Sequence, residues 1–314
     1  MTKNGLNKRI FTVIVSYNGL LWIEDSINSV IGDTTVIVVD NLSTDGTRDL
    51  IKSKFPSVLL LEQEKNHGFG KANNIGIGYA FENNAEYILL LNQDAKMQKG
   101  SIEELFYASH EHEEFGILSP IHCDWEGEFL ESSFSGYMSY EKNKFFYSDF
   151  VLSKEKQKIY EVTFFAAACW FMSKKAVLNV GGFDPIFKHL GEDVNLAQRF
   201  RYHGYKLGVL PNCKVMHDTM NRKYDKIDKF SDQYFYKLDY RSKMKFADLN
   251  ISNWQEKLNY AKNQVKKEAL LSLLKFRLTD LKGYLKELKE LSRIELECAK
   301  SRELNRRTGD HYLN

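Results

Sequence analysis

The sequence lacks the features that mark secreted, membrane-spanning and nucleic-acid-binding proteins. Its four cysteines, Cys123, Cys169, Cys213 and Cys298, are scattered without a Cys-x-x-Cys pair, which disfavours a zinc knuckle and a disulfide framework. No apolar run reaches the ~18 residues of a spanning helix, and no long apolar region follows the basic N-terminus, so neither a membrane span nor a signal peptide is expected. The formal net charge of +2 is too small to favour nucleic acid as a partner. These absences predict a protein of the reducing cytoplasm that does not cross a membrane.

The composition is that of an ordinary globular protein. Hydrophobic residues make up 43% of the 314 positions and charged residues 27%, which argues against a disordered or fibrous chain. This length accommodates one large domain, or a domain of about 200 residues with an appendage.

Apolar runs and helical patterns alternate through the first third of the chain. Short apolar runs predict strands at Ile10–Val15, Thr35–Val39, Val58–Leu61, Tyr87–Leu91 and Gly116–Ser119. Helices are predicted between them at Leu20–Val30, Thr47–Phe55, Lys71–Phe81 and Ile102–His110. This alternation predicts an α/β fold with a mostly parallel sheet, right-handed crossovers and helices on both faces.

Polar residues follow four of the predicted strands. They are Ser16, Tyr17 and Asn18 after the first strand, Asp40 and Asn41 after the second, Asn66 to Lys71 after the third, and Asn92, Gln93 and Asp94 after the fourth. Because the carboxyl ends of parallel strands share one edge, where open α/β sheets bind ligands, these groups are expected to converge. An aromatic face, hydrogen-bond acceptors, a lysine and a carboxylate that can hold a divalent cation together predict a nucleotide site. Taken singly, Tyr17 also fits a half-buried core position, and Asp40 and Asp94 fit turn or helix-capping positions.

Two common nucleotide-binding signatures are missing. No Gly-x-Gly-x-x-Gly follows the first strand, which disfavours a dinucleotide-binding fold. The segment Gly68-Phe69-Gly70-Lys71 lacks the spacing and the hydroxyl of a phosphate-binding loop.

The polar blocks, taken in order, resemble those of glycosyltransferase family 2. The matching blocks are Val13–Asn18, Val38–Asn41 with Ser43–Thr47, Asn66–Asn74, Leu89–Asp94, Gly181–Pro185, Gly191–Asp193 and His217. They cover about two thirds of the chain, roughly residues 8 to 218, and look most similar to bacterial rhamnosyltransferase-like enzymes of polysaccharide synthesis. The resemblance implies the A-type glycosyltransferase fold and a sugar-nucleotide donor.

By position, the resemblance implies roles for individual residues. The nucleotide sugar would be bound by Ser16, Tyr17, Asn18, Asp40, Asn41, Asn66, Lys71, Asn92 and Gln93. Asp94 would be the metal-binding end of the family's Asp-x-Asp motif, with His217 as a second ligand of Mg²⁺ or Mn²⁺. This chain departs from the motif at Asn92, which replaces the first Asp and offers the metal one carboxylate fewer.

Residues 120–218 are expected to form an acceptor half, after a nucleotide-binding half at residues 1–119. Trp170 is expected to form the bottom of the acceptor pocket. The alternative for its apolar run is packing in the hydrophobic core. Glu192 and Asp193 open a predicted helix, where carboxylates also suit the positive end of the helix dipole. The resemblance places this pair at the anomeric carbon, with Asp193 as the base that takes the proton of the acceptor hydroxyl and Glu192 as the second candidate.

Residues 219–314 are predicted to be a helical extension. Residues 250–314 hold 14 Lys and Arg against 9 Asp and Glu, a net charge of +5. Leucines spaced by three and four form a heptad-like seam of Leu271, Leu274, Leu278, Leu281, Leu285 and Leu288. The seam is compatible with packing onto the catalytic domain, with a homo-oligomer, or with peripheral contact with an anionic membrane.

The whole sequence predicts an inverting, metal-dependent glycosyltransferase acting on a growing bacterial surface glycan of the O-antigen or capsule type. Its partners would be a nucleotide sugar and a glycan or lipid-linked glycan, in the cytoplasm or at the inner face of the membrane, with no nucleic acid. One alternative is a sugar nucleotidyltransferase, although the Gly-rich, Arg- or Lys-containing loop of such enzymes is missing after the first strand. Another is a non-catalytic sugar-nucleotide-binding protein. The donor is left open among dTDP-rhamnose, UDP-galactose, UDP-glucose and UDP-N-acetylglucosamine.

Overall fold

A nine-stranded mixed sheet forms the centre of the computed structural model, which describes residues 9–219 and 226–313. The strands are β1 (Ile10–Ser16), β2 (Thr35–Asp40), β3 (Leu59–Glu62), β4 (Tyr87–Asn92), β5 (Ala95–Met97), β6 (Phe115–Cys123), β7 (Tyr160–Val162), β8 (Cys169–Ser173) and β9 (Lys206–His217). Along the sheet they lie in the order β3-β2-β1-β4-β8-β6-β9-β5, and β7 pairs with β9. The stretch from Lys3 to Lys8, on which the expectation about a signal peptide rests, lies outside the described residues.

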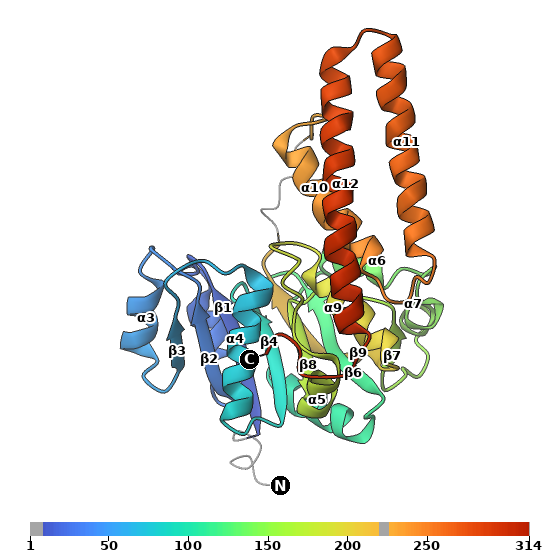
Figure 1. The fold of residues 1–314 in the computed structure, drawn as a ribbon. Helices are drawn as coiled ribbons and strands as arrows, with labels where there is room; N and C mark the ends of the chain where they lie inside the picture. Colours follow the sequence, from blue (N-terminus) through green and yellow to red (C-terminus); the bar gives the residue numbers. More distant parts are fainter. Residues whose placement is uncertain (1–8, 220–225, 314) are drawn as a thin grey trace.

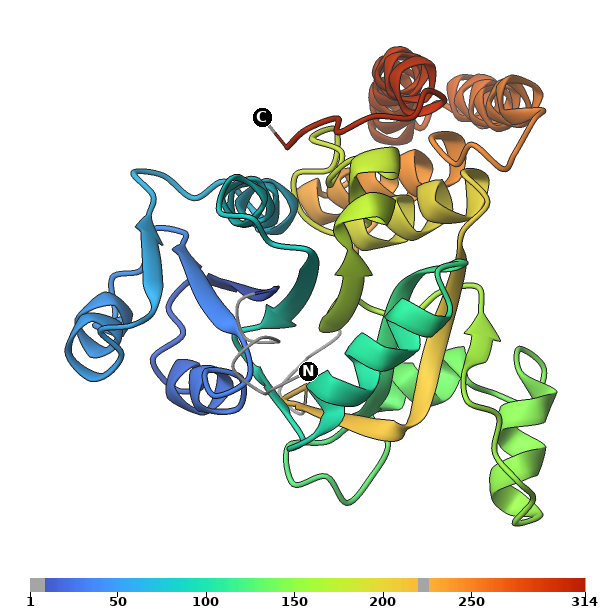
Figure 2. The ribbon, with the colours of Figure 1, turned by 90° about the horizontal axis from the view of Figure 1, so that it is seen from below.

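Helices cover both faces of this sheet, as predicted. They are α2 (Ile23–Asn28), α3 (Thr47–Lys54), α4 (Phe69–Glu82), α5 (Ser101–Glu111), α6 (Ser132–Tyr137), α7 (Lys144–Val151), α8 (Lys174–Val180) and α9 (Glu192–Tyr202). Apolar residues of α4, α8 and α9 pack in one hydrophobic core, and those of α2, α3 and α5 pack in a second core on the opposite face. Figure 2 shows α2 and α4 on opposite sides of β1 and β2.

The N-terminal half of the sheet, which is predicted to bind the nucleotide, is parallel. β1 pairs in parallel with β2 on one side and with β4 on the other, and β3 continues the parallel order beyond β2. The side chains of β1 and β4 are almost all buried because helices cover both faces, which explains their continuous apolar sequences. The register pairs Ser16 with Asp40 and Val15 with Asn92, so the exits of these strands reach the same edge.

Antiparallel strands enter the sheet in the half that is predicted to bind the acceptor. β8 lies between β4 and β6 and runs antiparallel to both, while β5 and β7 run antiparallel to β9. β6 and β9 are parallel, with a register shift between Pro120 and Ile121, and β6 continues to Cys123 beyond its predicted end at Ser119. The predicted parallel sheet is therefore one half of a larger mixed sheet.

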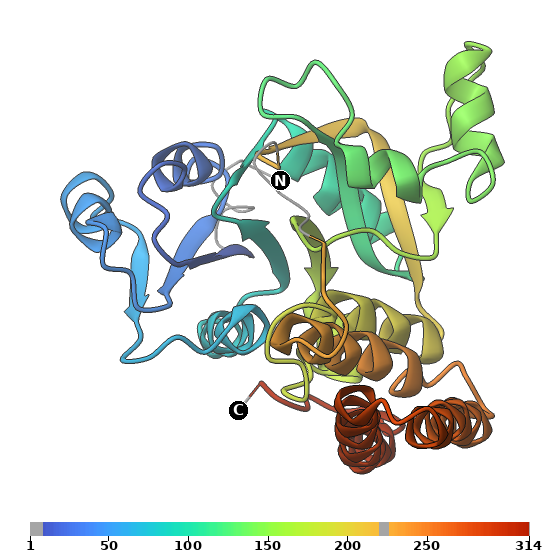
Figure 3. The same cartoon turned by 90° about the horizontal axis from the view of Figure 1, so that it is seen from above.

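Three helices follow β9: α10 (Asp232–Phe246), α11 (Trp254–Leu274) and α12 (Leu278–Asn305). Figure 1 shows α11 and α12 as an antiparallel hairpin that stands away from the sheet, and Figure 3 shows α10 between this hairpin and the sheet. The base of the hairpin packs around Trp254, Leu258 and Ile294. Ser301 and Asn305 at the end of α12 donate hydrogen bonds of 2.6 and 2.8 Å to Asp184, which ties the hairpin to the catalytic part. The helical character of the extension is confirmed.

The predicted leucine seam is not continuous. The chain reverses between Leu274 and Leu278, so the seam is divided between two antiparallel helices. The prediction of one continuous leucine seam is therefore wrong. Four of its leucines are between 44% and 66% exposed: Leu271, Leu274, Leu278 and Leu285. Among the described residues, no helix has both the length and the apolar content needed to cross a membrane.

Candidate active site

A cavity of about 270 Å³ lies at the carboxyl edge of the parallel strands. Its walls are Val15, Tyr17, Asn41, Asn66, Gly68, Phe69, Asn92, Gln93, Asp94 and His189. The structure thus brings together side chains from the exits of all four predicted parallel strands. Tyr17 is 48% exposed, so its ring is available to a stacking partner.

Amide side chains hold the strand exits together around this cavity. The side-chain carbonyl of Gln93 accepts hydrogen bonds from the hydroxyl of Ser16 (3.0 Å) and the backbone N–H of Tyr17 (2.9 Å), and its amide donates to the Tyr17 carbonyl (3.2 Å). Asn41 donates to the side-chain oxygen of Asn66 (2.9 Å). These bonds fix the rim of the cavity before any ligand binds.

Four of the predicted nucleotide-binding residues do not line the cavity: Ser16, Asn18, Asp40 and Lys71. Ser16 is fully buried and supports Gln93. Asn18 has a φ of +50°, and its side-chain oxygen accepts a hydrogen bond of 2.8 Å from the backbone of Thr44, which joins the exits of β1 and β2. Lys71 is exposed in the first turn of α4.

Asp40 is fully buried at the end of β2, and only one of its two carboxylate oxygens is paired among the described residues. Its Oδ1 accepts a hydrogen bond from the Ser43 backbone (3.0 Å) and forms an ion pair with the Arg48 guanidinium. Its Oδ2 has no hydrogen-bond partner among the described residues. A buried acceptor without a partner is costly, so an N–H group of a ligand would be favoured there.

Asp94 and His217 meet at the edge of the sheet. Their Oδ1 and Nε2 atoms are 3.4 Å apart, and the other ring nitrogen of His217 is 3.4 Å from the carboxylate of Glu131. The same Glu131 oxygen is 3.3 Å from Nδ1 of His122, whose Nε2 lies 2.9 Å from the hydroxyl of Ser119. His122, Glu131 and His217 are all buried, with potential ligand atoms within 4.8 Å of one another.

The carboxylates set the protonation of this cluster. Burial alone would lower the pKa of His217, but Asp94 and Glu131 outweigh it and raise the pKa to about 9. Burial would raise the pKa of Glu131, whereas hydrogen bonds from His122, His217 and Ser133 hold it well below its usual value. With Nδ1 of His217 directed at Glu131, its Nε2 is left directed at Asp94.

The residues at this edge fit a divalent cation. The buried side-chain oxygen of Asn92 has no hydrogen-bond partner among the described residues. Nε2 of His217 faces the Asp94 carboxylate at 3.4 Å, where a cation would replace its proton. Together with the carboxylate of Asp94 they are the oxygen and imidazole donors that Mn²⁺ accepts, and the oxygens also suit Mg²⁺. Asp94 keeps 24% of its side chain exposed, so this donor is open to the cavity that it lines.

Glu192 and Asp193 occupy the first turn of α9, after Gly191 with a φ of +92°. Glu192 is 5% exposed, and its Oε2 has no hydrogen-bond partner among the described residues. Burial therefore raises the pKa of Glu192 to about 7. Burial also raises the pKa of Asp193, against hydrogen bonds from the backbone N–H groups of Val194 and Ala167.

The segment around Ala167 and Ala168 connects this carboxylate pair to the cavity. Ala167 contacts Asp193, and the carbonyl of Ala168 accepts a hydrogen bond of 2.9 Å from the backbone of Asn92. Asp193 is partly exposed, whereas Glu192 is buried. Asp193 is thus the more accessible of the two carboxylates to an incoming hydroxyl.

The expectation for Trp170 is corrected by the structure. This side chain is fully buried in β8, with its ring stacked on Phe183 at 6.2 Å and its N–H bonded to the Ala166 carbonyl. It packs inside the hydrophobic core because β8 is an interior strand of the sheet, covered on both faces. An acceptor cannot contact Trp170 without displacing this core.

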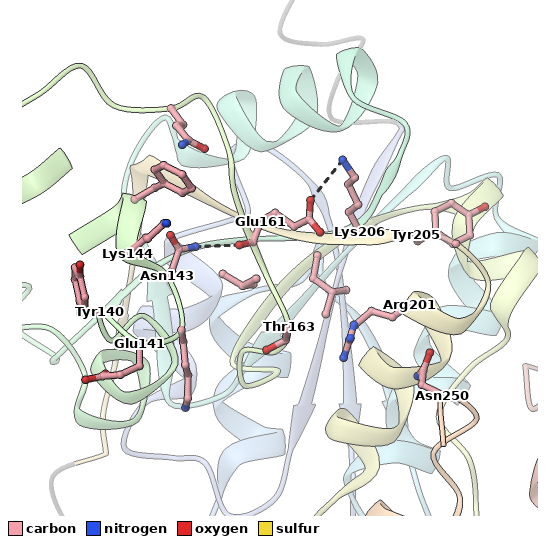
Figure 4. A pocket seen from close by; sticks show the side chains of 16 residues that line it. Tyr140, Glu141, Asn143, Lys144, Glu161, Thr163, Arg201, Tyr205, Lys206 and Asn250 are labelled. Atoms are coloured by element: carbon pink, nitrogen blue, oxygen red, sulfur yellow. Dashed lines mark hydrogen bonds and ion pairs between the residues drawn. The ribbon is translucent and has the colours of Figure 1, made fainter. Parts of the chain in front are cut away.

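A larger cavity of about 850 Å³ lies elsewhere on the molecule. Figure 4 shows its walls, with an ion pair between Lys206 and Glu161 and a hydrogen bond from Asn143 to the Glu161 backbone. Lys206 begins β9 and His217 ends it, so the strand separates this cavity from the Asp94–His217 pair by up to ~40 Å. None of the predicted site residues lines it.

Three residues near the smaller cavity were not predicted from the sequence. His189 lines the cavity, and Glu131 and His122 support His217 from behind. A histidine inside an apolar strand was the available signal for His122, since a buried imidazole needs a polar partner. Glu131 carried no comparable signal among the many acidic residues of its region.

Comparison with known proteins places this geometry in a family. The model of the family described as "Glycosyl transferase family 2" matches residues 12–181, which is more than half of the chain. The low-salt glycan biosynthesis hexosyltransferase Agl10 of Haloferax volcanii is 24% identical over 252 residues, covering 79% of this chain and 78% of the relative. The dTDP-rhamnosyl transferase RfbF of Shigella flexneri is 26% identical over 218 residues, covering 68% and 70%.

The fold is shared with solved structures. The crystal structure of GalNAc-T7 with UDP, GalNAc and Mn²⁺ superimposes with a TM-score of 0.57 at 16% identity, over 89% of this chain. The present chain spans 56% of that longer protein, so the likeness concerns the fold. The predicted A-type glycosyltransferase fold is confirmed, and the chain belongs to glycosyl transferase family 2.

Proposed function

We propose that this protein is an inverting glycosyltransferase that moves a rhamnosyl or hexosyl residue from a nucleotide sugar to a hydroxyl of a bacterial surface glycan. The observation that carries the proposal is that two pairs of side chains lie on either side of the short segment around Ala167 and Ala168. The Asp94–His217 pair lies at the end of β4, and the Glu192–Asp193 pair lies beyond Ala167 and Ala168. A donor in the cavity would have its diphosphate at the first pair and its anomeric carbon near the second.

A pyrimidine nucleotide suits the base end of the cavity. The half-exposed ring of Tyr17 offers a stacking face, and the free oxygen of Asp40 offers an acceptor for the N–H of uracil or thymine. The names of the relatives support such donors, since RfbF is named for dTDP-rhamnose and GalNAc-T7 was crystallised with UDP. We therefore place dTDP-rhamnose first among the candidate donors, followed by the UDP sugars.

Asp94 and His217 would hold Mg²⁺ or Mn²⁺, which neutralises the charge that develops on the departing nucleoside diphosphate. The Mn²⁺ in the GalNAc-T7 structure supports this assignment. Asn92 is suited to the ribose or to the metal through its unpaired side-chain oxygen. Glu131 would influence the cation indirectly, because it fixes the orientation of the ring of His217, the proposed metal ligand.

Asp193 is the proposed catalytic base. As the acceptor oxygen attacks the anomeric carbon, the Asp193 carboxylate takes its proton, the new glycosidic bond forms, and the bond to the diphosphate breaks on the opposite face. This direct displacement inverts the anomeric configuration. Glu192 is the alternative base and a candidate acceptor contact, and its buried carboxyl lies beside Asp193 in the same helical turn.

The proposed acceptor is a lipid-linked glycan of O-antigen or capsule type, met at the inner face of the membrane. The name of Agl10, a glycan biosynthesis hexosyltransferase, supports a glycan acceptor. A lipid-linked substrate requires the enzyme to work as a peripheral protein at the surface that carries the lipid.

The test is a donor panel with a lipid-linked glycosyl diphosphate acceptor, Mn²⁺ and full-length enzyme. We expect one nucleotide sugar to be consumed, with release of the nucleoside diphosphate and an inverted linkage in the product by NMR. Release of inorganic diphosphate from a sugar phosphate and a nucleoside triphosphate would instead identify a nucleotidyltransferase. Donor binding without turnover for every donor and acceptor would identify a non-catalytic binding protein.

A further inference from the structure

The α11–α12 hairpin ends in a group of exposed apolar side chains. This hairpin tip, residues 266–282, exposes Leu270, Leu271, Leu273, Leu274, Phe276 and Leu278 by 44% to 87%, with Phe276 the most exposed. Figure 1 shows the tip at the end of the hairpin farthest from the sheet. Single exposed leucines are ordinary, but six large apolar residues within nine positions form a patch of the kind that marks an interaction surface.

These apolar side chains are not needed to hold the hairpin together. Near the tip, the buried positions of α11 are the small residues Ala269 and Ser272, while the leucines beside them face outward. The hairpin is anchored at its base, where Trp254 and Leu258 pack against α12. The exposed leucines therefore add little to the stability of the isolated chain.

The turn at the tip places an aromatic side chain in an unfavourable backbone conformation. Phe276 has a φ of +55°, in the left-handed region where helix ends usually carry glycine. Backbone hydrogen bonds from Phe276 to the Leu273 carbonyl (3.1 Å) and from Arg277 to the Ser272 carbonyl (2.9 Å) hold this turn. The Phe276 side chain is 87% exposed, so its ring is available to a surface outside the chain.

The tip is basic. It carries Lys266, Lys267, Lys275, Arg277 and Lys282 against Glu268 and Asp280, so its net charge is 5 − 2 = +3, and all five basic side chains are exposed. Two copies of the tip placed together would bring like charges into contact. An anionic surface with an apolar interior is complementary to both the charge and the leucines.

We propose that the hairpin tip docks the enzyme on an anionic lipid surface, with Phe276 and the neighbouring leucines at the boundary between headgroups and acyl chains. α11 has 21 residues and is ~30 Å long, so the tip projects well beyond its base. β9, which ends in His217, ends on the side of the sheet from which the hairpin rises (Figure 1). Docking would therefore bring the active-site edge toward the lipid that carries the acceptor, which is the one point that rests on the proposed function.

The test measures binding of the full-length protein to vesicles by flotation. Vesicles of phosphatidylcholine with about 30% phosphatidylglycerol should bind the protein, and vesicles of phosphatidylcholine alone should bind it at least ~10-fold more weakly. Raising the salt from about 0.1 M to about 1 M should weaken binding, because the Debye length falls from about 10 Å to about 3 Å. Equal binding to both kinds of vesicle, or none to either, would overturn the proposal.

Two variants locate the contact. The variant with Leu274→Ser, Phe276→Ser and Leu278→Ser removes apolar surface, and the Lys275→Glu, Arg277→Glu variant reverses charge; each should bind anionic vesicles at least ~10-fold more weakly. All five side chains are exposed, so the fold and donor hydrolysis should be unchanged.

Leu296→Ser is the matched control, because Leu296 is 66% exposed on α12 outside the tip and should not affect binding. Unchanged vesicle binding by both tip variants would refute the assignment. The assignment would also be refuted if light scattering showed that the wild type is a dimer, that the apolar variant is a monomer, and that lipid changes neither result. Donor hydrolysis measured without lipid reports the proposed function separately, so failure of one proposal does not imply failure of the other.

Discussion

Glu192→Gln should make the protein more stable at alkaline pH. The Glu192 carboxyl is 5% exposed, and one of its oxygens has no hydrogen-bond partner among the described residues. Burial raises its pKa from the ordinary 4.5 to about 7. Each pKa unit corresponds to 1.36 kcal/mol, so ionising this group in the folded protein costs about 3 kcal/mol more than in the unfolded chain.

The sign of the pH dependence follows from the raised pKa. Below pH 4.5 Glu192 is protonated in both states and costs nothing. Between pH 4.5 and 7 the unfolded chain releases the proton while the folded protein keeps it, so the free energy of unfolding falls as the pH rises. Above pH 7 the loss is constant. Gln cannot ionise, so the variant should exceed the wild type by less than about 1 kcal/mol at pH 5 and by about 3 kcal/mol at pH 8.

The measurement is urea unfolding of both proteins at several values between pH 5 and 8, followed by circular dichroism. Glu103→Gln is the matched control, because Glu103 also lies in the first turn of a helix but is exposed. This control should give the same difference from the wild type at every pH. A stability difference for Glu192→Gln that does not grow with pH would show that the carboxyl is already solvated or paired in solution.

Four further outcomes test the site. Asp193→Asn should lower turnover ~10²–10⁴-fold in steady-state assays without changing donor affinity. If Asp193→Asn stays active while Glu192→Gln is inactive, the catalytic base is Glu192 and not Asp193. Asp94→Asn and His217→Ala should each abolish Mn²⁺ binding measured by electron paramagnetic resonance while the chain stays folded; activity that persists in excess chelator would contradict the metal assignment. Glu131→Gln should weaken Mn²⁺ binding ~10–100-fold, because it loses the carboxylate that orients the ligand, and unchanged affinity would make Glu131 merely structural. Tyr17→Ala should raise the dissociation constant of the nucleoside diphosphate measured by calorimetry. Equal affinity of the wild type and the variant would exclude stacking of the base on Tyr17.

The nucleotide-binding half was predictable because its signals are local. Each parallel strand is a continuous apolar run that stops at a polar residue, and the polar residue marks the strand's carboxyl end. Parallel pairing then places Ser16 beside Asp40, and the two strand exits share an edge without further information. Even here the sequence could not separate the side chains that face the cavity, such as Asn92, from those that support them, such as Ser16.

The acceptor half depends on contacts between distant segments and was less predictable. Glu131 and His217 are 86 residues apart and meet because β6 and β9 are neighbours. The burial of Trp170 follows from the insertion of β8 between β4 and β6, which an apolar run alone does not reveal. The leucine spacing continues without interruption across the turn at Phe276. The turn was therefore not predicted, since a left-handed φ at a phenylalanine does not alter the periodicity of the sequence.

A sheet ladder positions Asp94 and His217, the proposed metal ligands. β5 runs antiparallel to β9 with Ala95 opposite His217, and the backbone of Asp218 donates a hydrogen bond of 3.0 Å to the carbonyl of Asp94. Asp94 lies in the predicted nucleotide-binding half and His217 in the predicted acceptor half, so this ladder joins the two. A register slip of one residue would turn His217 to the opposite face of the sheet and remove it from both Asp94 and Glu131. The three residues of β5 are therefore the element on which the pairing of Asp94 with His217 depends.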